Sequence, residues 1–239
     1  MEASLLSDTT VVLVHGAFAE SASWSGVIAL LQAAGHHVIA APNALRSLSS
    51  DSAALSALIA SIDGPVVLAG HSYGGSVITN AARGHDHVRA LAYIAAFAPV
   101  EGESVGDVQG PDSGSTLGST LTAVRLADGT NDLYIRPELF HEQFAADLPP
   151  AQAGLMAATQ RPVRDVVLTE ASGTPAWQTL PSWFLLAGAD HNIPIDVQRF
   201  MAARAGARDI VEVGEASHAV LVTHPDQVAA LILDAIAAA

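Results

Sequence analysis

The stretch from Pro65 to Ala82, PVVLAGHSYGGSVITNAA, decides how the rest of this chain is arranged. Its first part, Val66 to Ala69, is a short apolar run that is typical of a strand buried on both faces of a parallel sheet. The small and apolar residues from Gly74 to Ala82 indicate a helix. Between the two lies GHSYG, a G-x-S-x-G sequence centred on Ser72. A strand that turns directly into a helix lifts that hydroxyl above the sheet, so the stretch predicts a nucleophile elbow.

The pentapeptide is a weak signal when it is taken without its surroundings, because only three of its positions are fixed. The alternative is a tight glycine turn whose serine caps the helix. The strand before Ser72 and the helix after it are the context that the chemistry requires, and they favour the elbow.

Length and composition fit a single domain of the α/β class. The chain has 239 residues, half of them hydrophobic, without an apolar run as long as a membrane span. Met1 to Thr10 has neither the basic nor the apolar segment of a signal peptide, so we expect a cytoplasmic protein. The absence of cysteine excludes disulfides, and the net charge of −14 disfavours nucleic acids and anionic membranes as partners.

Strand and helix patterns alternate along the chain, which predicts a mainly parallel sheet of about six strands flanked by helices. The alternation is interrupted by residues 101–180, which begin with a Gly-, Ser-, Asp- and Pro-rich segment and continue with two short helices between Arg136 and Gln160. We therefore predict one domain over 1–239, with a core of 1–100 and 181–239 and a helical cap, 101–180, inserted after the fourth strand. Strands are expected at Thr10–Val14, His37–Ala41, Val66–Ala69, Val88–Phe97, Ser182–Ala187 and Asp209–Val213, and core helices at Trp24–Ala34, Ser50–Ile62, Gly74–Ala82, Ile195–Ala205 and Pro225–Ala239.

A nucleophilic serine needs a histidine base and an acid that orients it, and in elbow folds the chain order is serine, acid, histidine. The acid belongs after a late strand, where Asp190 follows SWFLLA; Glu101 and Glu103, after an earlier strand, are the alternative. The base belongs after the last strand, where His218 follows DIVEV; His224 competes with it but leads into the final helix.

The remaining histidines do not form a convincing metal site. The sequence His85-Asp86-His87 resembles one, but it lacks a third partner, and a solvated helix end is the simpler interpretation. The loop His15-Gly16-Ala17 has one glycine where a dinucleotide-binding loop needs three. We therefore expect no metal and no cofactor.

Several segments spread over nearly the whole chain carry a family resemblance. The chain resembles the α/β-hydrolase fold enzymes, and among them the small esterases grouped with plant methyl-ester hydrolases and hydroxynitrile lyases. The segments are VLVHGAF, WSGVIALLQAAGHH, GHSYGG, the run from Arg136-Pro137 to Arg161-Pro162, LLAGADHNIP and VGEASHAVLVTHP.

The resemblance implies a triad of Ser72 as nucleophile, His218 as base and Asp190 as orienting acid. It also implies that the backbone N–H groups of Ala17 and Tyr73 form the oxyanion hole, with Phe18 as the alternative to Ala17. The expected function is therefore hydrolysis of carboxylic esters through an acyl-enzyme.

We expect a small-molecule ester as the partner, and a homodimer is left open. A mostly apolar pocket under the cap favours small to medium apolar esters. The candidate liners are aromatic or apolar residues of the early loop and the cap: Phe18, Tyr134, Phe140, Phe144 and Met156.

Three other functions use the same fold: a hydroxynitrile lyase, a cofactor-free perhydrolase and a non-catalytic small-molecule receptor. Two positions depart from the lyases that the chain resembles. Those lyases carry a lysine after the triad histidine and a threonine beside the first oxyanion donor, where this chain has Ala219 and Gly16. Both departures favour hydrolysis.

Overall fold

The computed structural model describes residues 9–110 and 113–238, and its centre is a six-stranded sheet. The strand order is β2-β1-β3-β4-β8-β9, and all neighbouring pairs are parallel, which confirms the expected fold class. The chain moves outward from β1 to β2 and then crosses to β3 on the other side of β1. The loops after β1 and β3 therefore meet at a topological switch point, where ligands of such sheets bind. The strands are β1 (Thr10–Val14), β2 (His37–Ala41), β3 (Val66–His71), β4 (Val88–Ile94), β8 (Ser182–Ala187) and β9 (Asp209–Val213).

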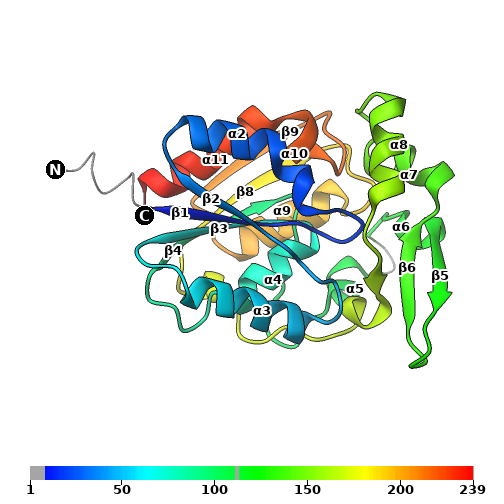
Figure 1. Cartoon of the computed structure of the whole chain (residues 1–239), viewed down its shortest axis with the longest axis horizontal. Coiled ribbons are helices and arrows are strands. Elements are labelled where there is room, and N and C mark those ends of the chain that lie inside the picture. Colours follow the sequence, from blue (N-terminus) through cyan, green and yellow to red (C-terminus); the bar gives the residue numbers. More distant parts are fainter. Residues whose placement is uncertain (1–8, 111–112, 239) are drawn as a thin grey trace.

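Helices cover both faces of the sheet (Figure 1). One face packs against α2 (Ser25–Ala33) and α11 (Pro225–Ala237), and the other against α3 (Leu48–Ala60), α4 (Tyr73–Ala81) and α9 (Ile195–Arg204). Successive side chains of a strand point to opposite faces, so Val11 and Leu13 lie in one core and Val12 and Val14 in the other. Burial on both sides explains why the central strands are uninterrupted apolar runs.

Several elements begin or end at other residues than expected, and the structure gives the reason for two of them. The α3 helix begins at Leu48, because the Ser47 side chain accepts a hydrogen bond from the Ser50 N–H and caps it. The β4 strand ends at Ile94, because Ala95 has φ of +42°, which is outside the extended region.

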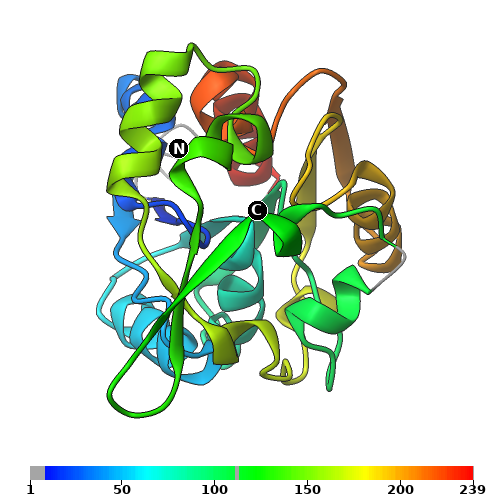
Figure 2. The same ribbon diagram turned by 90° about the vertical axis from the view of Figure 1, so that its right-hand side faces the viewer.

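Between β4 and β8 the chain leaves the sheet and forms a cap over the carboxyl ends of the strands (Figure 1). The two short helices expected here are α7 (Pro137–Phe144) and α8 (Pro150–Thr159). The cap is not purely helical, however: β5 (Leu121–Arg125), β6 (Asn131–Ile135) and β7 (Val163–Arg164) form an antiparallel sheet. Figure 2 shows the β5–β6 hairpin projecting from the cap. Much of β5 is exposed, so it has no apolar alternation by which sequence analysis recognises a strand.

The other short elements are the α5 helix (Val105–Gln109), α6 (Leu117–Thr120), α10 (Val220–Thr223) and the 3-10 turns η1 (Ser21–Trp24), η2 (Asp165–Leu168) and η3 (Ala176–Gln178). Of these, α10 follows the last strand and its loop, and η1 follows the loop after β1. Within 9–110 and 113–238, no helix is both long and apolar enough to cross a bilayer.

Candidate active site

Ser72 lies at the sharp turn between β3 and α4. Its backbone has φ of +54° and ψ of −124°, a strained conformation that is typical of a nucleophile elbow. The glycines on either side are required by close contacts. A Cβ on Gly70 would lie 2.5 Å from the Gly74 carbonyl oxygen, and one on Gly74 would lie 2.4 Å from the Val14 carbonyl oxygen. The G-x-S-x-G pattern is therefore a packing requirement of this turn.

Asp190 and His218 meet at the ends of two neighbouring strands, β8 and β9. His218 Nδ1 lies 2.6 Å from Asp190 Oδ2, and both side chains are fully buried. The N–H groups of Asn192 and Ile193 donate to Asp190 Oδ1 over 2.7 and 2.9 Å. Because the carboxylate holds Nδ1, the other ring nitrogen, Nε2, is left to accept a proton from a hydroxyl.

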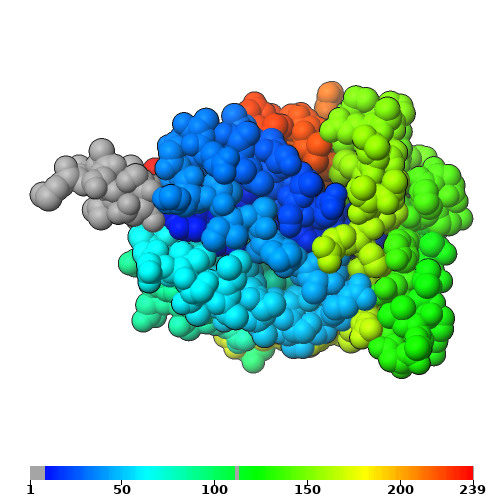
Figure 3. Space-filling view, in the orientation of Figure 1, coloured from blue at the N-terminus to red at the C-terminus, as the bar shows by residue number. Residues whose placement is uncertain are grey.

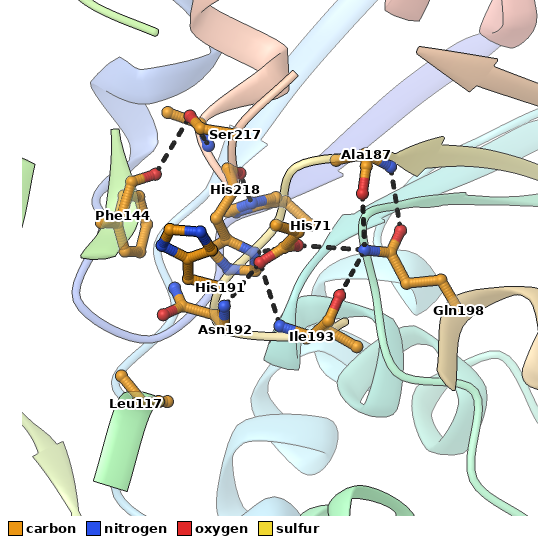
Figure 4. Close-up of polar contacts among 12 residues, drawn as sticks. His71, Leu117, Phe144, Ala187, His191, Asn192, Ile193, Gln198, Ser217 and His218 are labelled. Atoms are coloured by element: carbon orange, nitrogen blue, oxygen red, sulfur yellow. Dashed lines mark hydrogen bonds and ion pairs between the residues drawn. The ribbon is translucent and has the colours of Figure 1, made fainter. Parts of the chain in front are cut away.

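A buried amide that the sequence analysis missed also holds Asp190. The Gln198 side chain, on α9, donates from Nε2 to Asp190 Oδ2 over 3.1 Å (Figure 4). The same nitrogen donates to the Ile193 carbonyl over 2.6 Å, and Oε1 accepts from the Ala187 N–H over 3.0 Å. Gln198 thus ties the end of β8 to the acid and its turn. The signal in the sequence is slight: a glutamine on the buried face of an otherwise ordinary helix.

His71, the residue before Ser72, connects the elbow to the loop that carries His218. Its Nε2–H donates to the His218 carbonyl oxygen over 2.9 Å, and the two rings lie 4.7 Å apart. Burial, with the neighbouring His218 as a second cause, holds the pKa of His71 well below 6.5. The ring is therefore neutral and acts as a fixed donor.

His15, at the end of β1, is a second buried neutral histidine. Its Nε2 accepts from the Asn43 N–H over 3.1 Å, so the proton is on Nδ1, which donates to the Gly16 carbonyl over 2.9 Å. Burial lowers the pKa of His15 to about 4. This pair of bonds fixes the loop that precedes Ala17.

The cap contacts the two loops that carry Asp190 and His218. The Phe144 ring lies edge-on to the His218 ring, with centroids 4.8 Å apart. Asp147 accepts hydrogen bonds from the Ser217 hydroxyl and, over 3.2 Å, from the Ser217 N–H. Ser217 immediately precedes His218, so the cap directly supports the backbone of the candidate base. Figure 4 shows a further contact of this kind, in which the Ser217 hydroxyl donates to the Phe144 carbonyl oxygen over 3.3 Å.

A second cap residue supports the acid loop in the same way. Gln143 donates from Nε2 to the His191 carbonyl over 3.0 Å and to Asn192 Oδ1 over 2.8 Å. The cap corner between α7 and α8 therefore contacts both loops at once.

A small cavity joins Ser72 and His218 to the loop after β1. Its volume is about 30 Å³, and Ala17, Phe18 and Tyr73 also line it. The Tyr73 side chain points elsewhere, since its hydroxyl donates to Asp51 Oδ2 over 3.0 Å, so this residue faces the cavity through its backbone. The other lining residues are Phe97, Val105, Gln109, Leu117, Val167, Leu168, Asn192 and Ile193.

The five candidate liners lie in different places. Phe18 lines the cavity beside Ser72, and Met156 lines a neighbouring groove. Phe140 and Phe144 are buried and stacked on each other at 4.9 Å, so they belong to the cap core, and Phe144 also contacts the His218 ring. Tyr134 lies on β6 opposite Thr122, outside the cavity.

The alternative acids and base are engaged elsewhere. Glu103 pairs with Arg204 over 2.7 Å, and Glu101 accepts from the Thr174 hydroxyl over 2.9 Å. His224 Nδ1 bonds to the Thr223 hydroxyl. His85 bonds to Ser56 and His87 to the Ile59 carbonyl, and no metal-binding group of three such side chains occurs in the part of the chain that the structure describes.

Comparison with protein families agrees with this geometry. Residues 11–231 match the model of the alpha/beta hydrolase family. The chain belongs to this family. The matched range begins in β1 and ends in α11, so it spans the complete parallel sheet together with the cap.

Curated relatives of this alpha/beta hydrolase include esterases. The chain is 25% identical to esterase PIR7B of Oryza sativa subsp. japonica over 98% of this chain and 97% of that protein. It is 28% identical to a pyrethroid hydrolase of Sphingobium wenxiniae over 95% of this chain and 87% of that one. Among solved structures, polyneuridine aldehyde esterase has a TM-score of 0.79 and 20% identity, covering 95% of this chain and 98% of its own, which shows a shared fold. These relatives confirm the expected enzyme class, a carboxylic ester hydrolase.

Proposed function

We propose that this protein is a serine esterase in which Ser72, His218 and Asp190 form a catalytic triad. The observation that carries the proposal is the cavity at the switch point of the sheet. It joins the hydroxyl at the strained elbow to a histidine whose Nδ1 lies 2.6 Å from a buried carboxylate. Such a constellation is recognised by geometry and roles.

In the proposed reaction, Ser72 Oγ attacks the ester carbonyl while His218 Nε2 takes the hydroxyl proton. The protonated His218 then gives this proton to the departing alcohol, which leaves an acyl group on Ser72. Water attacks the acyl carbonyl while His218 accepts one of its protons, and His218 then gives this proton to Ser72 Oγ as the acyl–oxygen bond breaks and the carboxylic acid leaves. Asp190 stabilises the positive imidazolium in both steps.

The oxyanion that forms in each step needs hydrogen-bond donors. We assign this role to the backbone N–H groups of Ala17 and Tyr73. Both residues line the cavity with Ser72, and Tyr73 begins α4, where the free N–H groups of the helix favour a negative charge.

Hydrolysis is favoured over cyanohydrin cleavage by two positions, Gly16 beside the serine and Ala219 directly after His218. A Cβ on Gly16 would lie 2.5 Å from Ser72 Cβ, so no threonine fits there without a shift of the backbone. Ala219 is buried in the apolar core, and none of the residues that line the described cavity is a lysine or an arginine. The described lining of the cavity therefore offers no permanently charged side chain to stabilise a departing cyanide.

The test combines turnover with active-site labelling. The purified protein is given p-nitrophenyl and methyl esters of graded acyl size, and separately a fluorescent organophosphonate. Steady ester turnover together with labelling of Ser72 supports the esterase. Labelling of Ser72 with only one acylation per protein molecule, and no further turnover, would indicate a receptor. Mandelonitrile at mildly acidic pH is the third arm. Aldehyde release well above that of Ser72→Ala would overturn the assignment as a hydrolase without lyase activity.

A further inference from the structure

A groove of about 370 Å³ lies outside the Ser72 cavity, between the cap helix α8 and the loop that follows β1. In Figure 3 the yellow-green surface of α8 lies beside the blue surface of residues near the start of the chain. Leu155 and Met156 form the α8 side of the groove, Phe18 and Ala22 form the other side, and Val222 of α10 also contributes. Its volume is within the range of sites that bind small organic molecules.

The surface of this groove is mainly apolar, which favours an apolar ligand without a negative charge. Leu155 is 70% exposed, the most exposed of the large hydrophobic side chains in the described chain. No lysine or arginine lines the groove, and its polar members are Glu20, Ser23, Gln152, Thr159 and Gln160. Two larger hollows of the described surface differ, because Arg83 lines both of them.

Phe18 separates this groove from the proposed catalytic cavity, because it lines both spaces. Phe18 is 3% exposed, and its backbone has φ of +59° at the turn after β1. The cavity beside Ser72, at about 30 Å³, has room for about two water molecules. An ester bonded to Ser72 must therefore place any sizeable substituent beyond Phe18.

We propose that the groove between α8 and the loop after β1 is the binding site for the larger apolar group of the ester substrate. This inference rests on the proposed esterase function and names the substrate class: esters with one small group and one extended uncharged apolar group. The small group remains beside Ser72, and the extended group passes Phe18 and lies on Leu155 and Met156.

The experiment measures kcat/KM for two graded series. One is the methyl esters of acetic to octanoic acid, and the other is the acetates of methanol to octanol, and both are followed by acid release. Each methylene that enters the groove is expected to raise kcat/KM by up to about fourfold, since burying a methylene contributes about 0.8 kcal/mol. The series that rises shows which side of the ester lies in the groove.

Two variants of the exposed residue Leu155 then test whether the extended group of the ester lies in the groove. Leu155→Glu places a charge in the groove and Leu155→Trp fills it, and each is expected to lower kcat/KM for the eight-carbon ester of the rising series by about tenfold, the loss of roughly two methylene contacts. The shortest ester should change less than twofold. The matched control is Phe200→Glu, which alters a helical residue that is 56% exposed and lies outside the groove.

The outcomes separate this inference from the esterase proposal. If p-nitrophenyl acetate turnover is no greater than that of Ser72→Ala, the esterase function itself fails. If acetate turnover is normal, but kcat/KM does not rise in either series or Leu155 variants affect short and long esters equally, the groove assignment is wrong. A selective loss with both Leu155 variants, absent in Phe200→Glu, supports it.

Discussion

The two halves of the proposed triad are held in different ways. Ser72 is fixed by backbone packing, of Gly70 against Gly74 within the turn and of Gly74 against Val14 on the neighbouring strand β1. Asp190 and His218 are also held by side chains of other elements: Gln198 from α9, and Asp147 from the cap. The nucleophile thus depends on close backbone packing, whereas the acid–base pair depends on side-chain hydrogen bonds. Substitution of Ser72 should therefore abolish activity, and substitution of the residues that support Asp190 and His218 should lower activity only in part.

The largest effect is expected from Ser72→Ala. Loss of a triad nucleophile typically lowers turnover by about a million-fold. The residue is at a helix start with no side-chain capping bond, so the fold should persist, which circular dichroism checks. Retention of more than about a tenth of wild-type ester turnover would reject Ser72 as the nucleophile.

Asp190→Asn should lower kcat by about ten-thousand-fold, because an amide favours the wrong tautomer of His218 and does not stabilise its charged form. Glu103→Gln is the control, since Glu103 pairs with Arg204 away from the site. We expect that control to retain most of the activity. The opposite ranking would move the acid to the earlier strand end.

The nucleophile half also contains the buried neutral histidines, and these predict a pH dependence of stability. The pKa of His15 is about 4 in the folded protein and about 6.5 when unfolded, so below pH 6.5 the unfolded chain binds a proton that the folded chain does not. The contribution of His15 to the free energy of unfolding should therefore be fully present above pH 6.5. As the pH drops to 4, protonation of His15 in the unfolded chain should lower the free energy of unfolding by about 3 kcal/mol in total. His71, whose pKa is also lowered, acts in the same direction.

Urea unfolding at intervals between pH 7.5 and 5 measures this slope. His15→Gln should reduce the slope by up to about 1.4 kcal/mol per pH unit, even if the variant is less stable overall. His141→Gln is the control, because this cap histidine is only partly buried. Equal slopes in the wild type and His15→Gln would show that His15 is not buried in its neutral form.

On the acid side, Gln198→Leu should lower kcat by about 10- to 100-fold, the range for a lost hydrogen bond to a charged group, with little change in KM. The reason is that Gln198 touches the carboxylate and its turn but does not line the cavity. The exposed Gln178, altered to Leu, controls for the substitution itself. A rise in KM with unchanged kcat would contradict this positioning role.

The smallest effect is expected from Asp147→Ala in the cap. Removing the bonds to Ser217 should lower kcat by about three- to tenfold, because Asp147 is exposed and water weakens these bonds relative to the buried bond of Gln198. Asp128→Ala, in the cap hairpin, is the matched control because Asp128 pairs with Arg164 instead. If the two variants behave alike, the cap does not support the base loop through Asp147.

The sequence by itself determined the parts of this protein that depend on neighbouring residues. The six strands, the elbow at Ser72 and the order of Asp190 and His218 follow from apolar runs, glycine spacing and position after a strand, because parallel strands place their carboxyl ends at one edge. The β5–β6 hairpin was not predicted. The side chains of β5 are mostly exposed, so its sequence does not show the alternation of apolar and polar residues that indicates a strand.

Only the tertiary structure decided which distant side chains meet. Gln198 and Asp147 are ordinary polar residues in sequence, and they acquire a role because α9 and the cap bring them to Asp190 and Ser217. The same holds for the aromatic residues: Phe18 faces the cavity, whereas Phe140 is packed inside the cap. The spacing of apolar residues along a helix predicts that such a side chain is buried. It does not predict which surface the side chain packs against, because that depends on how elements far apart in the chain pack together.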